Sequence, residues 1–444
     1  MKIISPANET YLRILKSQKG NADVYRKMHF CVEQETEDGV LIYNLVSKEM
    51  ILLSQEEYAK LTELEELREH CFAVPENTNE KACVKLIRMV VAANSKKREA
   101  ITTYRIFTTT DCNARCFYCY ELADRRINMT QETARKVADY IIAHCCGEEV
   151  EFIWYGGEPL YNHEVIDTIC DSLRSAGIQF KSWAVSNGYL FDDEMVRKAV
   201  EKWNVNRAQI TLDGTEAVYN KVKAYIYRGG NPYEIVLANI ERLLNAGISV
   251  AIRLNLDLHN AEDLLTLVEE LKQRFEGKKK PRIYAHHIMD MFGSMGDLHT
   301  DEEWRKRQDA MDRLEALIEE NGFAAKQGIN KGFKINSCNA DSGSAVTVLP
   351  NGELGLCESY LETEFIGHID REELDQEMIR SWKELVPEIP ECDTCFYYPD
   401  CFHLKKCCNV RECYHMEREI RYKKIQFYMR NEYRGWKEKQ SAAE

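Results

Sequence analysis

The feature that most limits what this chain can form is a loop with three closely spaced cysteines, placed directly after a strand. Strand-forming residues run from 104 to 110, and Cys112, Cys116 and Cys119 follow. Thiolates are soft ligands, so three of them on one loop can hold three irons of a 4Fe-4S cube and leave the fourth iron open. A structural zinc site usually has four protein ligands, and a disulfide framework is unusual in a chain this long. The loop therefore predicts an iron-sulfur cluster with one open iron.

Length and composition limit the class of protein further. The chain has 444 residues, of which 44% are hydrophobic and 30% are charged, which predicts a soluble globular protein of two or three domains. No apolar run is long enough for a membrane span, and the N-terminus lacks a signal-peptide core, so we expect a cytoplasmic protein. Seventeen cysteines under reducing conditions indicate metal sites rather than disulfides. The net charge of -14 argues against a nucleic-acid partner.

Residues 1–97 are predicted to form a small separate domain. Three short strands are expected at 30–39, 40–44 and 49–53, the first two joined by a turn at Asp38 and Gly39. Ser54 and Glu57 form a capping-box pattern, which predicts the start of one helix running through Tyr58, Leu61, Leu64 and Leu67.

From about residue 102 to 291, strand and helix patterns alternate, which is typical of a parallel α/β sheet. One strand, 150–155, ends in Gly156-Gly157-Glu158-Pro159, and the next ends in Ser186 and Asn187. Glycines let backbone approach a ligand closely, and a carboxylate suits an ammonium group. The strand 250–257 alternates apolar residues with Arg253, Asn255 and an aspartate, so its polar face should look into the lumen of a barrel.

The cysteine spacing followed by Gly-Gly-Glu-Pro resembles the radical SAM superfamily. The resemblance implies that Cys112, Cys116 and Cys119 bind a 4Fe-4S cluster whose open iron is chelated by S-adenosylmethionine (SAM). It also implies SAM contacts from Tyr118, from the turn Gly156, Gly157, Glu158 and Pro159, and from Ser186 and Asn187. Arg253 and Asn255 either touch SAM or form an internal salt-bridge network. Where the family has an arginine, this chain has Lys223, which keeps the charge but loses the bidentate fork.

The resemblance implies a partial (β/α)6 TIM-type barrel over residues 98–295, with residues 296–335 as a bridging region. Residues 1–97 resemble the winged-helix-like element that recognises peptides on enzymes of this kind; the alternative is a cap that only packs on the barrel. Residues 416–444 are expected to form a C-terminal amphipathic helix on the surface.

A second group of cysteines lies within residues 336–415 and resembles the SPASM extension, which holds two auxiliary 4Fe-4S clusters. The implied ligands are Cys338, Cys357, Cys392, Cys395, Cys401, Cys407, Cys408 and Cys413. Two departures stand out: Lys405 occupies a position where the family has a cysteine, and a second cysteine after Cys338 is missing. The choice between Cys407 and Cys408 therefore stays open, and the inner cluster has room for a substrate thiolate. A zinc ribbon is the alternative for residues 392–413.

These resemblances imply a maturase of ribosomally synthesised peptides that uses SAM and three 4Fe-4S clusters. Such an enzyme releases a 5′-deoxyadenosyl radical that takes a substrate hydrogen, while the auxiliary clusters accept the surplus electron or bind substrate. Its partners would be a precursor peptide, whose leader binds the N-terminal domain, and an electron donor such as flavodoxin or ferredoxin.

We expect thioether formation between a cysteine sulfur and a peptide carbon. The alternatives are carbon-carbon cross-linking, formylglycine formation on sulfatases, and an iron-sulfur peptide carrier without SAM chemistry. Glu358 stands where sulfatase maturases have an aspartate base, and a glutamate can make the same proton transfer.

Overall fold

The chain forms two compact units, one of which is assembled from three separate stretches of sequence. A computed structural model describes residues 1–94, 100–119, 126–227, 229–288, 301–325, 328–333, 335, 338–359, 364–407 and 415–441. The first unit comprises residues 1–97, 326–337 and 385–444, and the second comprises 98–325 and 338–384. No helix within the described ranges is long and apolar enough to cross a membrane.

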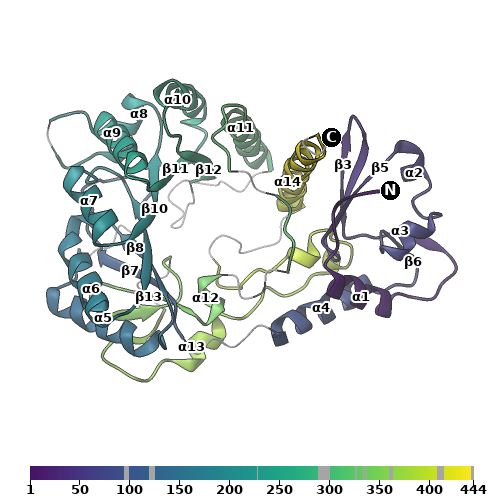
Figure 1. Cartoon of the computed structure of the whole chain (residues 1–444), viewed down its shortest axis with the longest axis horizontal. Coiled ribbons are helices and arrows are strands. Elements are labelled where there is room, and N and C mark those ends of the chain that lie inside the picture. The colour runs from purple at the N-terminus through teal and green to yellow at the C-terminus, as the bar shows by residue number, and fades with distance from the viewer. Residues whose placement is uncertain are drawn as a thin grey trace. The chain divides into compact units, whose positions relative to one another are not determined.

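The second unit, here called the core unit, is built on a sheet of nine strands (Figure 1). Six parallel strands lie side by side in chain order: β7 (Thr103–Thr109), β8 (Val150–Gly156), β9 (Phe180–Ser186), β10 (Val205–Leu212), β11 (Ser249–Leu256) and β12 (Arg282–His287). The expected six-stranded barrel sheet is therefore confirmed. Beyond β7 the sheet continues through β13 (Ala345–Val348), which is parallel to β7, and the antiparallel β14 (Glu353–Gly355) and β15 (Phe365–His368).

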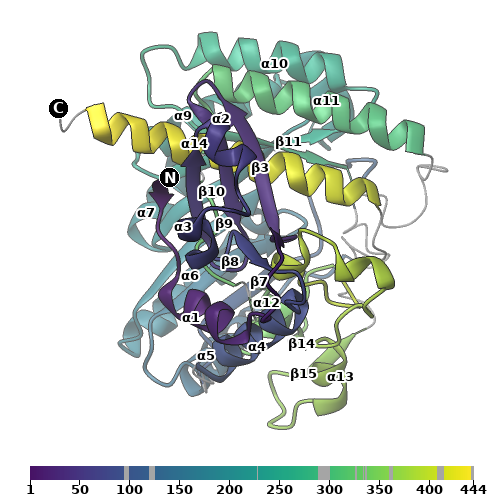
Figure 2. The same ribbon diagram turned by 90° about the vertical axis from the view of Figure 1, so that its right-hand side faces the viewer.

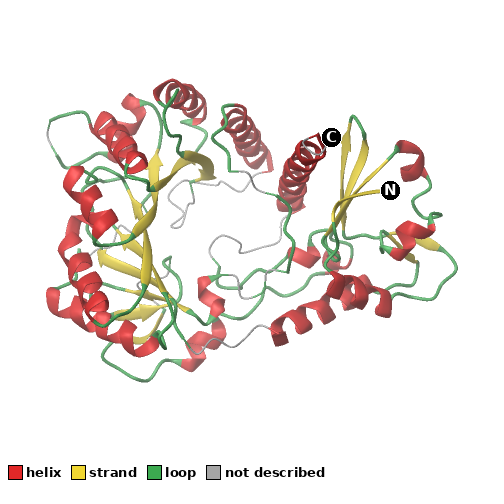
Figure 3. Cartoon of the chain, viewed as in Figure 1, coloured by secondary structure: helices red, strands yellow, loops and turns green. Residues whose placement is uncertain are grey.

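Helices alternate with the parallel strands and cover the outer side of the sheet (Figure 3). They are α5 (Gln131–His144), α6 (His163–Ser175), α7 (Asp193–Glu201), α8 (Glu216–Lys223), α9 (Pro232–Asn245), α10 (Ala261–Arg274) and α11 (Asp301–Glu320), followed by the shorter α12 (Asn339–Ser342) and α13 (Gln376–Ser381). Figure 2 shows α10 and α11 side by side, where they pack together. The apolar residues of β11, Val250, Ile252, Leu254 and Leu256, are buried as the alternation predicted.

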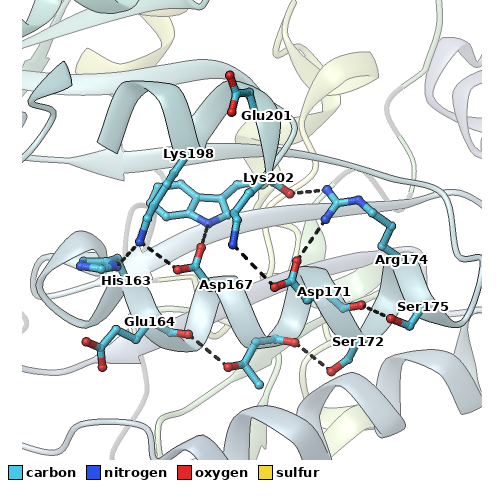
Figure 4. Close-up of polar contacts among 12 residues, drawn as sticks. His163, Glu164, Asp167, Asp171, Ser172, Arg174, Ser175, Lys198, Glu201 and Lys202 are labelled. Atoms are coloured by element: carbon cyan, nitrogen blue, oxygen red, sulfur yellow. Dashed lines mark hydrogen bonds and ion pairs between the residues drawn. The ribbon is translucent and has the colours of Figure 1, made fainter. Parts of the chain in front are cut away.

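Polar contacts fasten neighbouring helices on the outside of the barrel. The Asp167 carboxylate on α6 accepts hydrogen bonds from Lys198 Nζ of α7 at 2.9 Å and from Trp203 Nε1 at 2.8 Å (Figure 4). Burial alone would raise the pKa of Asp167, but these two donors bring it below its usual value. This cluster ties α6 to α7 on the outer layer of the core unit.

The first unit, here called the composite unit, contains a four-stranded antiparallel sheet in the order β1-β5-β4-β3. The strands are β1 (Lys2–Ser5), β3 (Cys31–Thr36), β4 (Gly39–Asn44) and β5 (Glu49–Leu53), and a small second sheet pairs β2 (Tyr25–Lys27) with β6 (Ala73–Pro75). Its helices are α1 (Glu9–Gln18), α2 (Gln55–Ala59), α3 (Glu65–Glu69), α4 (Glu80–Asn94) and α14 (His415–Ser441).

One local prediction in this unit is wrong. The capping box of Ser54 and Glu57 is present, but the helix it opens ends at Ala59, and α3 begins only at Glu65. The turn between the two helices lets Leu61 and Leu67 both reach the hydrophobic core, where they are 6% and 0% exposed. Packing of two leucines thus overrides the continuous helical pattern.

Both faces of the four-stranded sheet are buried, and α14 supplies part of the core. One face packs on a cluster that includes residues of α1 and α4. The other face packs on Ile425, Met429 and Tyr433 of α14, and Met429 is completely buried. The C-terminal helix was expected on the surface, yet its apolar stripe is a structural element of the N-terminal sheet.

The two edge strands of this sheet are β1 and β3. On one side, β1 pairs inward with β5. On the other side, the backbone N–H of Glu33 in β3 donates to the Tyr422 hydroxyl at 3.1 Å, and its carbonyl accepts from Gln426 Nε2 at 2.7 Å. Side chains of α14 therefore replace the hydrogen bonds that a neighbouring strand would make at Glu33.

Candidate functional site

The residues predicted to bind the cofactor gather at the carboxyl ends of β7 to β11. Because parallel strands end at the same edge of a sheet, loops that are far apart in the sequence meet there. The cysteine loop follows β7, the Gly-Gly-Glu-Pro turn ends β8, and Ser186 ends β9. This edge of the core unit is the candidate site.

The two glycines are required by the close approach of the turn to the cysteine loop. Gly156 has φ +121°, and a Cβ on it would lie 2.2 Å from the carbonyl oxygen of Thr109. A Cβ on Gly157 would lie 2.3 Å from the carbonyl oxygen of Asp111. The Glu158 N–H donates to that same Asp111 carbonyl at 3.0 Å. The two glycines therefore allow the turn to pack against the cysteine loop. From the sequence, we expected them only to let backbone approach a ligand.

Glu158 is a buried carboxylate whose hydrogen-bond donors are all uncharged. Its oxygens accept from the Ser186 hydroxyl at 2.9 and 3.1 Å, from the Asn187 N–H at 2.8 Å, and from the Leu160 N–H at 3.2 Å. Complete burial raises its pKa to about 7, against the lowering effect of these donors. An ammonium group placed beside it would compensate the charge, so the pocket fits the amino group of a ligand such as SAM.

The three cysteines lie on one partly buried loop next to this carboxylate. The Cys112 sulfur accepts from the Ala114 N–H at 3.3 Å and from Asn187 Nδ2 at 3.7 Å, and the Cys119 N–H donates to the Cys116 carbonyl at 3.2 Å. Burial, together with the charge of Glu158, raises the pKa of the Cys112 thiol to about 12. Across the described residues, no three His, Cys, Asp or Glu side chains converge closely enough to hold a metal ion. Cluster binding therefore rests on the thiol donor set and stays a prediction.

Asp213 and Lys223 belong to the site, although the sequence pointed to Lys223 only as a departure from the family's arginine and did not point to Asp213. They form an ion pair of 3.0 Å with side chains 0% and 4% exposed. The Tyr118 hydroxyl donates to Asp213 Oδ1 at 2.6 Å and accepts from Lys223 Nζ at 3.3 Å. The sequence feature that could have identified Asp213 as a site residue is its position directly after β10, because Gly156 and Ser186 also stand at the ends of their strands.

Arg253 and Asn255 take part in an internal network. Arg253 Nε donates to Asn255 Oδ1 at 2.9 Å, and Arg253 Nη2 lies 3.0 Å from His286 Nδ1. Asn255 Nδ2 donates to Asp213 Oδ1 at 3.2 Å. The sequence offered two alternatives, a SAM contact or an internal salt-bridge network. The structure contains an internal polar network, and hydrogen bonds form it. A SAM contact by either residue stays a prediction.

Glu358 lies just after β14 and forms a partly buried ion pair with Arg105 of β7. The Arg105 guanidinium fixes the position of the Glu358 carboxylate. To act as a base, Glu358 must accept a proton while it is paired with this cation. In the same unit, Cys338 precedes α12 and Cys357 precedes Glu358.

The other described cysteines of this group, Cys392, Cys395, Cys401 and Cys407, fall in the composite unit, whereas Cys408 and Cys413 lie outside the described residues. Cations from the N-terminal stretch hold this segment. Arg88 donates to the carbonyls of Tyr398 and Cys401 at 2.5 and 2.7 Å, Lys48 pairs with Asp400 at 2.5 Å, and Lys81 pairs with Asp393 at 2.6 Å.

Comparisons with known proteins address the core unit. Residues 106–271 match the profile of the radical SAM superfamily. A curated relative, the radical SAM cyclopropyl synthase TigE of Paramaledivibacter caminithermalis, is 25% identical over 257 residues. That match covers 51% of this chain and 49% of the relative, so the chain spans about half the length of the curated relative.

Solved structures show the same fold at lower identity. The structure of native anSMEcpe with bound AdoMet and the Kp18Cys peptide has a TM-score of 0.57 and 15% identity, covering 73% of this chain and 97% of that one. Native anSMEcpe with bound AdoMet has a TM-score of 0.54 and 16% identity, covering 74% and 96%. The cysteine loop and the Gly-Gly-Glu-Pro turn stand at the ends of the first two strands of this shared fold. Residues 106–271 of the chain are therefore similar in sequence to the radical SAM superfamily, and the chain shares its fold with anSMEcpe.

Proposed function

We propose that this protein is a radical SAM enzyme that modifies a ribosomally synthesised precursor peptide. The observation that carries the SAM part is Glu158, a buried carboxylate with only uncharged donors, placed against the cysteine loop. The peptide part is supported by the likeness of fold to anSMEcpe, which has been solved with a bound peptide. We further propose three 4Fe-4S clusters, from the two groups of cysteines.

Each group at the strand ends has a role in this proposal. Cys112, Cys116 and Cys119 hold the SAM-binding cluster, and Glu158 pairs with the amino group of SAM. Ser186 and Asn187 orient Glu158 and stand beside the SAM carboxylate. When bound, the reduced cluster and SAM together supply a 5′-deoxyadenosyl radical that removes a hydrogen atom from the peptide.

For the bond formed, we propose a thioether between a cysteine sulfur and a peptide carbon. A C–H bond and an S–H bond break and one S–C bond forms, so the peptide loses one hydrogen atom to the radical, one proton, and one electron that an auxiliary cluster would accept. Glu358 would take the proton, held in place by Arg105. The support is the missing cysteine after Cys338, which leaves room for a substrate thiolate.

A second candidate, a carbon-carbon bond, is favoured by the name of the curated relative, a cyclopropyl synthase. This reaction also removes two hydrogens from the peptide, so mass alone does not separate the two products. The fate of the cysteine thiol does, because a thioether consumes it and a carbon-carbon bond leaves it free.

The test uses reconstituted, reduced protein with SAM and a cysteine-containing precursor peptide sought among the neighbouring reading frames. We expect release of 5′-deoxyadenosine, a peptide lighter by two hydrogens, and loss of one iodoacetamide-reactive thiol. A product that keeps every reactive thiol would establish the carbon-carbon alternative. Absence of 5′-deoxyadenosine in the presence of a reducible cluster would contradict the radical SAM activity and leave an iron-sulfur carrier.

We propose that the composite unit recognises the leader of the peptide by strand addition at an edge of the four-stranded sheet. At the β3 edge, side chains of α14 bond the backbone groups of Glu33, and Met429 of that helix is completely buried. The other edge strand, β1, has four residues and, among the described strands, pairs with β5 alone. The β1 side is therefore the less costly place for an added strand, and this assignment predicts that the leader lies beside residues 2–5.

A further inference from the structure

A buried ion pair lies against the cysteine loop, in addition to the residues assigned above. Asp213 follows β10, Lys223 is the last residue of α8, and their side chains are almost completely buried. Burial lowers the pKa of Lys223, but Asp213 and Cys116 raise it well above its usual value, so the lysine is a cation. The pair is therefore two opposite fixed charges inside the protein.

Backbone and side-chain bonds fasten this pair to the cysteine loop. The Arg115 N–H donates to the Lys223 carbonyl at 2.7 Å, and three residues further along the Ile226 N–H donates to the Asn113 carbonyl at 2.9 Å. Tyr118, between the last two cysteines, bonds to both charged side chains. A displacement of Lys223 therefore moves residues adjacent to all three cysteines.

The pair is electrically balanced, and among the described residues Lys223 is the one charged side chain bonded to Asp213. Apart from Lys223, Asp213 is bonded by uncharged groups, the Tyr118 hydroxyl and Asn255 Nδ2. Removing the lysine would leave an uncompensated carboxylate in a region of low dielectric constant, and removing the aspartate would leave an uncompensated ammonium. Either change would act electrostatically on the neighbouring thiols, with opposite sign.

We propose that Lys223 and Asp213 are positioning residues that hold the cysteine loop and set the electrostatic potential, and hence the reduction potential, at its thiol cage. The proposal rests on the proposed function, in that Cys112, Cys116 and Cys119 ligate the SAM-binding cluster. It assigns Lys223 to the loop rather than to a direct SAM contact. Since reduction adds negative charge, a nearby cation favours the reduced form and a nearby anion opposes it.

The test is EPR-monitored redox titration of the reconstituted holoenzyme, in which the SAM-binding cluster is recognised by its spectral change on adding SAM. We expect Lys223→Met to lower the midpoint potential and Asp213→Asn to raise it. The double variant should return towards the wild-type value, and Lys223→Arg should stay near it. Shifts of the same sign in both single variants, or none in either, would overturn the proposal.

The double variant also tests the case in which Lys223→Met does not take up the cluster. If Lys223→Met binds too little iron to be titrated, charge balance predicts that adding Asp213→Asn restores iron content and spectrum. Failure of that restoration overturns the proposal. A weaker SAM affinity in Lys223→Met without any shift of potential also overturns it, because this would mark a direct SAM contact.

The chain offers a matched control in the ion pair of Lys198 and Asp167, which joins the outer helices (Figure 4). Lys198→Met removes a cation from a pair of similar length, and none of its partners belongs to the cysteine loop. The midpoint potential should be unchanged in this variant, and an equal shift would overturn the specific role of Lys223. None of these measurements needs the peptide, so failure of peptide modification would leave the result intact. Iron content unaffected by loss of all three loop cysteines would instead refute the cluster assignment itself.

Discussion

The core unit and the composite unit are built in opposite ways. In the core unit, one strand or loop after another contributes a site residue, and successive strands are neighbours in the sheet. In the composite unit, one face of the sheet packs on residues from the opposite end of the chain, as with Val32 of β3 and Met429 of α14. Motifs therefore reveal the first kind of assembly, whereas only the packed structure reveals the second.

This difference changes how the units can be tested. Deleting residues 1–97 would remove the partner of α14 and the cations that hold the segment around Cys401. The remaining chain would expose a stripe of apolar side chains, so such a deletion does not isolate peptide recognition. Point substitutions separate the two units more cleanly.

The largest effect is expected in the core unit, from replacing Cys112, Cys116 and Cys119 together by alanine. Of about twelve irons in three cubes, about four should be lost, together with all SAM cleavage. Iron analysis and assay of 5′-deoxyadenosine measure both outcomes. An unchanged iron content would remove the basis for the SAM-binding cluster.

In the composite unit, Met429→Ala should cost about 2–5 kcal/mol of its free energy of unfolding, because it opens a cavity at a fully buried position. Hydrogen exchange of the backbone amides of β4 and β5 at increasing urea concentration measures the loss, because five of the six tryptophans lie in the core unit and make fluorescence unsuitable. The SAM-dependent spectrum of the core unit should persist at urea concentrations that unfold the composite unit. If both signals disappear together, the two units unfold as one and the contrast between them fails.

A smaller and more selective effect is expected from Glu158→Gln. The amide keeps the shape but loses the charge that pairs with an ammonium, so SAM affinity should fall about ten- to hundredfold. Equilibrium dialysis with labelled SAM measures the change, and Glu164→Gln on α6 is a matched control that should bind normally. Equal affinity in the Glu158 variant would show that the carboxylate does not bind the amino group.

The sequence predicted those features that depend on neighbours in the chain. The six parallel strands and the turn at Gly156 follow from local patterns. The break between α2 and α3 was not predictable, because it depends on where Leu61 and Leu67 find the core. In the sequence, Lys223 is only a departure from a family pattern. Its proposed role depends on its ion pair with Asp213, which is ten residues away and on another element.

The covered β3 edge of the composite unit also bears on solubility. An uncovered edge strand can pair with the same strand of another molecule, which is a common start of aggregation. Here Tyr422 and Gln426 occupy the backbone groups of Glu33 that face away from β4, and the opposite edge strand, β1, has only four residues. A strand that joins the sheet beside β3 must first break these bonds, so a chance encounter between two copies gains little there. The same arrangement would direct an added peptide strand to the short β1 side.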